Sequence, residues 1–207
     1  MKFRFLTAEE VDCRVSTVSE KGCSLLLYKD ARCDQIILDE TVGPMNWQRR
    51  HTRENANCIV SLWDKEKNQW VSKEDTGTES FTEKEKGLAS DSFKRACFNW
   101  GIGRELYTAP FIWVKAGDVQ LKPKGNGFTT YDRFECTYMR VENGKIVALN
   151  IENKTLHRTV YVFGNIMPDD ICSVCGKPVK KEIADKSRAA NGVVFCSGTC
   201  KKVAGGA

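Results

Sequence analysis

Two close pairs of cysteines constrain the C-terminal part of this chain more than any other feature of the sequence. The stretch "CSVCGKPV" contains Cys172 and Cys175, and the stretch "FCSGTCKK" contains Cys196 and Cys200. A glycine beside each pair lets the backbone turn tightly, so that amide groups can approach the sulfur atoms. Two such turns can close a tetrahedron of thiolates around one ion. The spacing therefore predicts one structural Zn²⁺ per chain.

The ligand set also indicates what this ion would do. Because all four ligands are thiolates, no coordination position is left for water, and catalysis by the metal is not expected. The segment is too short to bury a core of its own, so metal binding would supply much of its folding energy. The alternative is four ordinary reduced cysteines. The segment resembles a zinc ribbon or a treble-clef knuckle, and we assign it residues 167–207.

The same segment is rich in basic side chains. They suit contact with nucleic acid or protein, although a solvated surface without a partner explains them equally well. These side chains are Lys177, Lys180, Lys181, Lys186, Arg188, Lys201 and Lys202.

The other cysteines indicate a reducing compartment. They are scattered singly through segments that read as strands or helices, where we expect reduced core thiols. No apolar run approaches the ~18 residues that a membrane span needs, and the N-terminal stretch lacks the features of a signal peptide. We therefore expect a cytoplasmic protein, in a bacterial or phage-infected cell, without membrane contact. These cysteines are Cys13, Cys23, Cys33, Cys58, Cys97 and Cys136.

The order of elements in residues 1–166 predicts the fold class. Two strands, "VDCRVSTV" and "GCSLLLY", precede a helix that Asp30 can cap and that Gly43 can end. Three strands that begin near Asn46, Asn57 and Gln69 then form an antiparallel meander. The sequence thus begins with strands and helices that do not alternate as in a parallel sheet.

The second half of this region continues the pattern. After a helix come the strand "FIWVKA", a polar loop "KPKGNGFTTYD", and the strands "FECTYMRVE", "KIVALNIE" and "TVYVFG". Asn143–Gly144 is a strong signal for a two-residue hairpin turn. We therefore predict an α+β fold with an antiparallel sheet and packed helices over residues 1–166, followed by the zinc-binding module.

The helix from about Thr82 to Trp100 has an unusual polar face. Its apolar stripe suits a core-facing helix. On the other side, Phe98 lies among charged residues that include Lys94 and Arg95. The alternatives are a solvated face for the cations and protein packing for the ring. The apolar stripe consists of Ala89, Phe93, Ala96, Cys97 and Trp100.

Basic side chains elsewhere could join this face. With a formal net charge of +5, the chain suits a polyanionic partner. A surface of cations and a stacking ring could hold the phosphates and bases of a single strand. For each cluster alone, a solvated surface is the alternative. The added cations are Lys29 and Arg32 at the first helix, and Arg49, Arg50 and Arg53 on the first meander strand.

These motifs carry a family resemblance. "GPMNWQRR", a meander and "EKEKGLASDSFKRACFNWGIG" resemble, over about residues 10 to 110, the annealing domain of the Rad-fifty-two family and its phage relatives of the Sak type. The family helix reads approximately E-x-x-A-x-x-D-(G/S)-(L/F)-K-R-A-x-x-x-(F/W)-G. The family often carries a cation one helical turn later, where Phe98 stands here. The matching residues are Ala89, Asp91, Phe93, Lys94, Arg95, Ala96, Trp100 and Gly101.

The resemblance implies a non-enzymatic function. It implies a β-β-β-α core, a homo-oligomeric ring or arc, and a basic groove that holds single-stranded DNA for annealing without ATP. Lys94 and Arg95 would take the place of the family's groove cations, and Arg32 lies near another DNA contact. A single-strand-binding protein or an exonuclease are further candidate partners. The zinc module is no part of the family pattern.

Two other function classes stay open at this point. One is a metal-dependent nuclease, because Asp132 precedes the E-x-K pattern of Glu152 and Lys154, which can hold Mg²⁺. The other is a zinc-bearing DNA-binding adaptor without annealing activity. No P-loop pattern is present, in agreement with annealing that needs no nucleotide.

Overall fold

The computed structural model describes residues 1–78, 84–165, 172–175, 177 and 179–204. It is a mixed α and β structure with antiparallel sheets, which agrees with the predicted α+β class. The predicted start of the second helix at Thr82 lies outside the described residues. The described α-helices are α1 (Ala31–Val42), α2 (Lys84–Trp100), α3 (Lys181–Asn191) and α4 (Gly198–Ala204).

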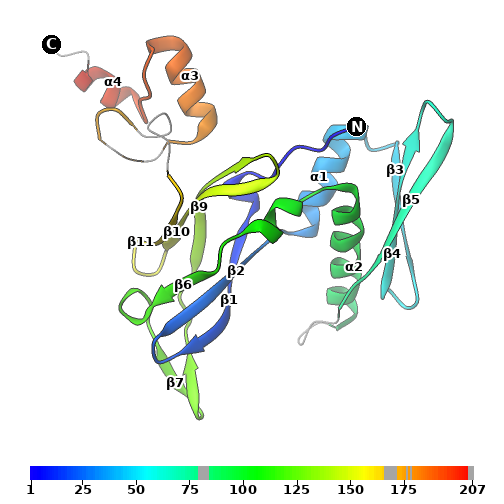
Figure 1. The fold of residues 1–207 in the computed structure, drawn as a ribbon, viewed down its shortest axis with the longest axis horizontal. Coiled ribbons are helices and arrows are strands. Elements are labelled where there is room, and N and C mark those ends of the chain that lie inside the picture. The colour runs from blue at the N-terminus through cyan, green and yellow to red at the C-terminus, as the bar shows by residue number, and fades with distance from the viewer. Residues whose placement is uncertain (79–83, 166–171, 176, 178, 205–207) are drawn as a thin grey trace. The chain divides into compact units, whose positions relative to one another are not determined.

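The strands form three sheets (Figure 1). One sheet has the order β11-β10-β9-β1-β2-β6, a second has the order β3-β4-β5, and a third consists of β7 and β8. The strands are β1 (Asp12–Ser19), β2 (Gly22–Tyr28), β3 (Trp47–Thr52), β4 (Asn57–Asp64), β5 (Gln69–Thr76), β6 (Ile112–Lys115), β7 (Lys122–Lys124), β8 (Gly127–Thr129), β9 (Phe134–Glu142), β10 (Lys145–Asn153) and β11 (Arg158–Phe163).

The chain divides into two compact units. The first comprises residues 1–16, 25–111 and 143–145, and the second comprises residues 17–24, 112–142 and 146–207. This division differs from the predicted domains 1–166 and 167–207, whose boundary lies outside the described residues. The β1–β2 hairpin and the β9–β10 turn contribute residues to both units, because the strands of one sheet are long and cross the division.

Local signals explain the first helix of unit 1. The Asp30 side chain accepts a hydrogen bond from the backbone amide of Arg32, which satisfies an otherwise unpaired donor at the helix start. Gly43 follows the last turn with a φ of 85°, a backbone conformation that glycine adopts without strain. Ile37 and Leu38 are fully buried. Helix α1 therefore runs where the sequence predicted it.

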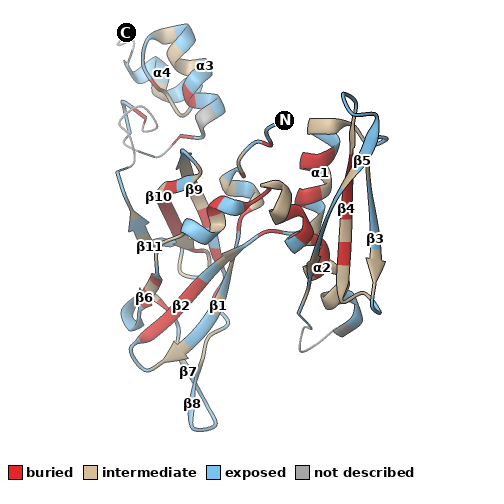
Figure 2. Cartoon of the chain, turned by 45° about the vertical axis from the view of Figure 1, so that its right-hand side comes forward, coloured by how far each residue is buried: buried red, intermediate tan, exposed pale blue. Residues whose placement is uncertain are grey.

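Helix α2 packs on one face of the β3-β4-β5 meander. Phe93, Ala96 and Cys97 are fully buried, which confirms the core-facing part of the predicted stripe. On β4, Cys58, Val60 and Leu62 are also buried. They share one face of the strand, because strand side chains alternate. Figure 2 shows the buried residues of β4 in red.

A glycine permits the close approach of β5 and α2. Gly77 follows β5 and donates its amide to the carbonyl of Ala56 at 2.8 Å. A Cβ atom at this position would lie 2.5 Å from the backbone nitrogen of Ser92. The chain therefore needs a residue without a side chain where the meander meets the helix.

Unit 2 contains a hairpin that the sequence analysis missed. Residues 122–132, expected to be a polar loop, instead begin with two short antiparallel strands, β7 and β8. Gly125 has a φ of 57°, as the first position of a type II′ turn requires. The two-residue turn Gly125–Asn126 thus closes a hairpin on polar strands. By contrast, the Asn143–Gly144 turn is as predicted, with φ values of 50° and 76°.

No helix in the described part of the chain is both long enough and apolar enough to cross a lipid bilayer.

Candidate metal site and candidate nucleic-acid interface

The four C-terminal cysteines converge on one point. Their sulfur atoms all lie within 4.8 Å of one another. Cys196 Sγ lies 3.5 Å from Cys175 Sγ and 3.4 Å from Cys200 Sγ. A tetrahedral ion bound at about 2.3 Å would hold its sulfur ligands about 3.8 Å apart. The cluster therefore has the composition and nearly the dimensions of a site that could hold a metal ion.

Short turns present the ligands of this cluster. Cys172 and Cys175 flank a turn, and the amide of Cys172 donates to the carbonyl of Lys177 at 2.8 Å. Cys196 precedes α4 and Cys200 lies in its first turn. The amide of Ser173 donates to the carbonyl of Val194 at 2.9 Å, which joins the two halves of the site.

The electrostatics of the cluster favour a bound cation. Backbone amides, first that of Cys175 and then that of Cys196, lower the pKa of the Cys172 thiol to about 6. Neighbouring sulfurs, first that of Cys200, raise the pKa of Cys196 to about 12, because they share its proton. Four crowded thiols cannot all ionise unless a cation compensates their charge.

A small apolar cluster supports the site. It consists of buried Val179, Ala184 and Val194 together with Cys172, and Cys196 and Cys200 pack against it. Between residues 172 and 204, the described residues form α3 and α4 and no strand. The choice between a zinc ribbon and a treble-clef knuckle therefore stays a prediction.

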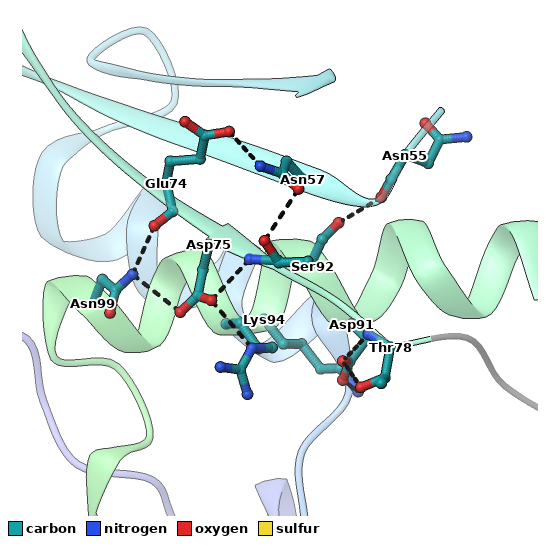
Figure 3. A network of polar contacts seen from close by, with 11 residues as sticks. Asn55, Asn57, Glu74, Asp75, Thr78, Asp91, Ser92, Lys94 and Asn99 are labelled. Carbon is teal, nitrogen blue, oxygen red and sulfur yellow. Dashed lines mark hydrogen bonds and ion pairs between the residues drawn. The ribbon is translucent and has the colours of Figure 1, made fainter. Parts of the chain in front are cut away.

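Lys94 and Arg95 lie on different sides of α2. Lys94 Nζ lies 3.9 Å from an oxygen of Asp91 one turn earlier on the helix. Arg95 points to the end of β5, where its Nε lies 3.2 Å from Asp75 Oδ1. Asn99 donates to the other oxygen of Asp75 at 3.2 Å (Figure 3). Asp75 thus ties α2 to the meander, and each predicted cation has one carboxylate partner.

The three arginines of the meander are separated by the pleat of β3. Arg49 faces α2, and its Cζ lies 4.8 Å from the centroid of the Phe93 ring. Arg50 is exposed on the opposite face of the sheet, because neighbouring strand residues point in opposite directions. Arg53 is exposed in the turn after β3, with a φ of 51°. The structure therefore does not bring these three cations to one face.

Lys29 is not on the surface, which corrects its prediction as a DNA-binding residue. Its side chain is 7 % exposed and forms an ion pair with the fully buried Asp34. Arg32, in contrast, is 84 % exposed and lies 3.1 Å from an oxygen of Asp30. The charge of Lys94 also lowers the pKa of Asp30, after a larger effect of the Arg32 amide, so Lys94 and Arg32 act on the same carboxylate.

Phe98 is covered by its own chain. Its ring centroid lies 4.6 Å from that of Tyr107, which belongs to the short 3₁₀ helix Arg104–Thr108. Arg104 Cζ lies 5.5 Å from the centroid of the Phe98 ring. Tyr107 itself is 72 % exposed, so the aromatic surface continues outward from Phe98 through this residue.

Sequence reasoning missed two cations at the end of α2. Lys73 Nζ donates to the carbonyl of Asn99 at 2.9 Å, and Arg104 Nη2 donates to the same carbonyl at 2.7 Å. Cations are favoured there because the last carbonyls of a helix carry partial negative charge. For Arg104, the signal was its position directly after the helix stop Gly101–Gly103.

The residues of the nuclease alternative do not converge. Asp132 is buried, and its Oδ2 accepts hydrogen bonds from Asn153 at 2.7 Å and from the amide of Gln120 at 2.8 Å. Glu152 lies on the opposite face of β10 from Asn153 and pairs with Lys154 at 3.2 Å. Among the described residues, the cysteine cluster is the group of potential ligands close enough to hold a metal.

Comparison with known proteins gives no neighbour: no family model, curated protein or solved structure matches the chain.

Proposed function

We propose that this chain is a single-stranded DNA-binding protein that anneals complementary strands without nucleotide hydrolysis. The observation that carries the proposal is the β-β-β-α arrangement of β3, β4, β5 and α2, with Lys94 and Arg95 on the helix away from its buried stripe. This order and these residues are the ones on which the sequence resemblance rests.

The ion pairs on α2 leave its cations available to a phosphate. Lys94 and Asp91 are 3.9 Å apart and both are partly exposed, and Arg95 is 45 % exposed beside Asp75. Exposed ion pairs of this kind contribute about 0–1 kcal/mol each. A phosphodiester brings a full negative charge and releases counterions when it binds, so it can compete with these carboxylates.

Annealing requires no catalytic group in this scheme. Cations that neutralise phosphates lower the repulsion between strands, and a surface that holds the backbone extended leaves the bases free to pair. A homo-oligomeric ring or arc would repeat the cations along one strand and convert a weak contact per subunit into tight binding. Zinc in the cysteine cluster would have a structural role, because all four ligands are thiolates.

A mixing assay with two complementary labelled oligonucleotides tests this function. The protein is added without nucleotide and with EDTA, so that neither ATP hydrolysis nor Mg²⁺-dependent cleavage can contribute. We expect the rate of duplex formation to exceed the spontaneous rate at least about tenfold, while both oligonucleotides keep their length. DNA binding without faster annealing would instead support the adaptor, and shortened strands in a parallel reaction with Mg²⁺ would support the nuclease.

A further inference from the structure

The proposed function uses no residue of the β7–β8 hairpin of unit 2. Among the described strands, β7 and β8 pair only with each other, in a register that sets Lys122 opposite Thr129 and Lys124 opposite Gly127. In Figures 1 and 2 it extends beyond the other strands of its unit. Residues 122–128 are all exposed. A two-stranded hairpin without a packed face is marginally stable, so its shape is not explained by a core.

The two faces of this hairpin differ in chemistry. Lys122 and Lys124 share one face, because strand side chains alternate. Tyr131 lies on that face as well, since Lys122 Nζ is 5.3 Å from the centroid of its ring. Pro123 and Phe128 are paired on the other face. One side of the hairpin thus combines cations with an aromatic ring, and the other side is apolar.

The segment that forms the hairpin has no carboxylate of its own to compensate its lysines. Residues 119–131 contain two lysines and no aspartate or glutamate. The acidic residues at either end of this segment are already engaged. Asp118 lies 3.5 Å from Arg158, and Asp132 is buried and accepts hydrogen bonds from Asn153 and Gln120. An approaching polyanion therefore meets an attractive potential at the hairpin.

The exposed aromatic ring indicates which class of polyanion the hairpin would bind. Tyr131, on the face of the lysines, is 71 % exposed, whereas Phe128 lies on the other face. An exposed ring beside lysines is the combination with which proteins bind single strands, because each base offers a face for stacking and each nucleotide offers a phosphate. A duplex keeps its bases stacked on one another, and an acidic peptide would use the lysines alone.

We propose that the β7–β8 hairpin is a second contact site for single-stranded nucleic acid. Lys122 and Lys124 bind phosphates, and Tyr131 stacks on a base. The proposal shares its class of ligand with the proposed function and rests on it in that respect, but it uses residues of unit 2 alone.

The test measures binding of the full-length protein to a fluorescent oligo(dT) by anisotropy over a range of salt concentrations. The hairpin variant Lys122→Glu with Lys124→Glu is compared with Lys65→Glu with Lys67→Glu in the β4–β5 turn, which changes the net charge equally. We expect the hairpin variant to bind at least about tenfold more weakly, with a salt slope shallower by about 0.7 for each lost contact. The control should bind like the wild type.

Variants of the ring separate stacking from charge. Tyr131→Ala should weaken binding about fivefold or more, since stacking on an aromatic ring contributes about 1–3 kcal/mol per base. Tyr131→Phe, which keeps the ring, should bind like the wild type. Thermal unfolding of every variant confirms that the chain is folded.

A helix variant, Lys94→Glu with Arg95→Glu, distinguishes this proposal from the proposed function. If the hairpin variants bind weakly and the helix variant binds normally, the hairpin site stands and the helix surface is wrong. If only the helix variant loses affinity, the hairpin proposal is overturned. Wild-type affinity and salt slope in folded Lys122→Glu with Lys124→Glu would overturn it in any case.

Discussion

Lys29 shows how the surroundings of a single residue decide its role. In the sequence it is one of several cations near the start of α1, and nothing distinguishes it from Arg32. In the structure it lies against buried Asp34, and a Cβ on Gly103 would lie 2.4 Å from its Cε. Burial alone would raise the pKa of Asp34 strongly, and Lys29 opposes this effect, so that the pKa is about 6. The pair is a structural element of unit 1.

Removal of the lysine charge should therefore destabilise the protein. Lys29→Met keeps much of the apolar volume but leaves Asp34 as an unpaired buried carboxylate, which typically costs about 3–5 kcal/mol. Arg32→Met, in the first turn of α1, removes a largely exposed pair and should cost less than about 1 kcal/mol. Urea unfolding of both variants measures the difference. Equal stability of the two variants would contradict this role of Lys29.

The pH dependence of the Lys29→Met effect has a definite sign. The pKa of Asp34 is raised in the folded chain from 3.8 to about 6, so the folded chain binds this proton more tightly than the unfolded chain. The contribution of the Asp34 carboxyl group to the free energy of unfolding is therefore fully present below about pH 4 and is lost as the pH rises through about 6. Without Lys29 the carboxylate is harder to ionise, so the loss of stability should be larger at pH 8 than at pH 5.

At the scale of elements, local signals predicted most of the fold. The strand Gly22–Tyr28 and the helix after Asp30 are where their sequences indicated, because a cap, a turn and a periodic pattern lie within the segment itself. The β7–β8 hairpin was missed because its strands are polar and lack the alternating apolar residues that signal a hairpin. Its Gly125–Asn126 turn was the available signal.

Contacts between elements that are far apart in the sequence could not be predicted from local sequence patterns. The hydrogen bonds of Arg95 and Asn99 to Asp75 join residues about twenty or more positions apart in the sequence. They depend on the orientation of α2 relative to β5. The need for glycine at position 77 has the same origin. The cysteine cluster could be predicted because its geometry follows from ligand spacing, whereas the helices between its halves carry no comparable constraint.

For the whole molecule, the C-terminal cluster should bind one zinc ion per chain. Elemental analysis of protein purified without a chelator measures the content. Cys172→Ser with Cys175→Ser should lose the ion, because two of four ligands are removed, and limited proteolysis should then cut between residues 172 and 204. Unit 1 should stay protected, since it contains none of the four ligands.

A single cysteine outside the cluster provides the control for this experiment. Cys13→Ser changes a half-buried thiol of β1 and should keep the full zinc content. A wild-type protein without zinc, or a Cys172→Ser with Cys175→Ser variant that still holds one ion per chain, would show that the four cysteines are not its ligands.

The claim that α2 presents the cations for single-stranded DNA is tested most directly by charge reversal on this helix. Affinity of the full-length protein for oligo(dT) is measured against salt concentration for Lys94→Glu with Arg95→Glu and for Lys65→Glu with Lys67→Glu. We predict that the helix variant binds at least about tenfold more weakly, with a slope shallower by about 0.7 per lost phosphate contact, and that the control is unchanged. A folded helix variant with wild-type affinity and slope would contradict the claim.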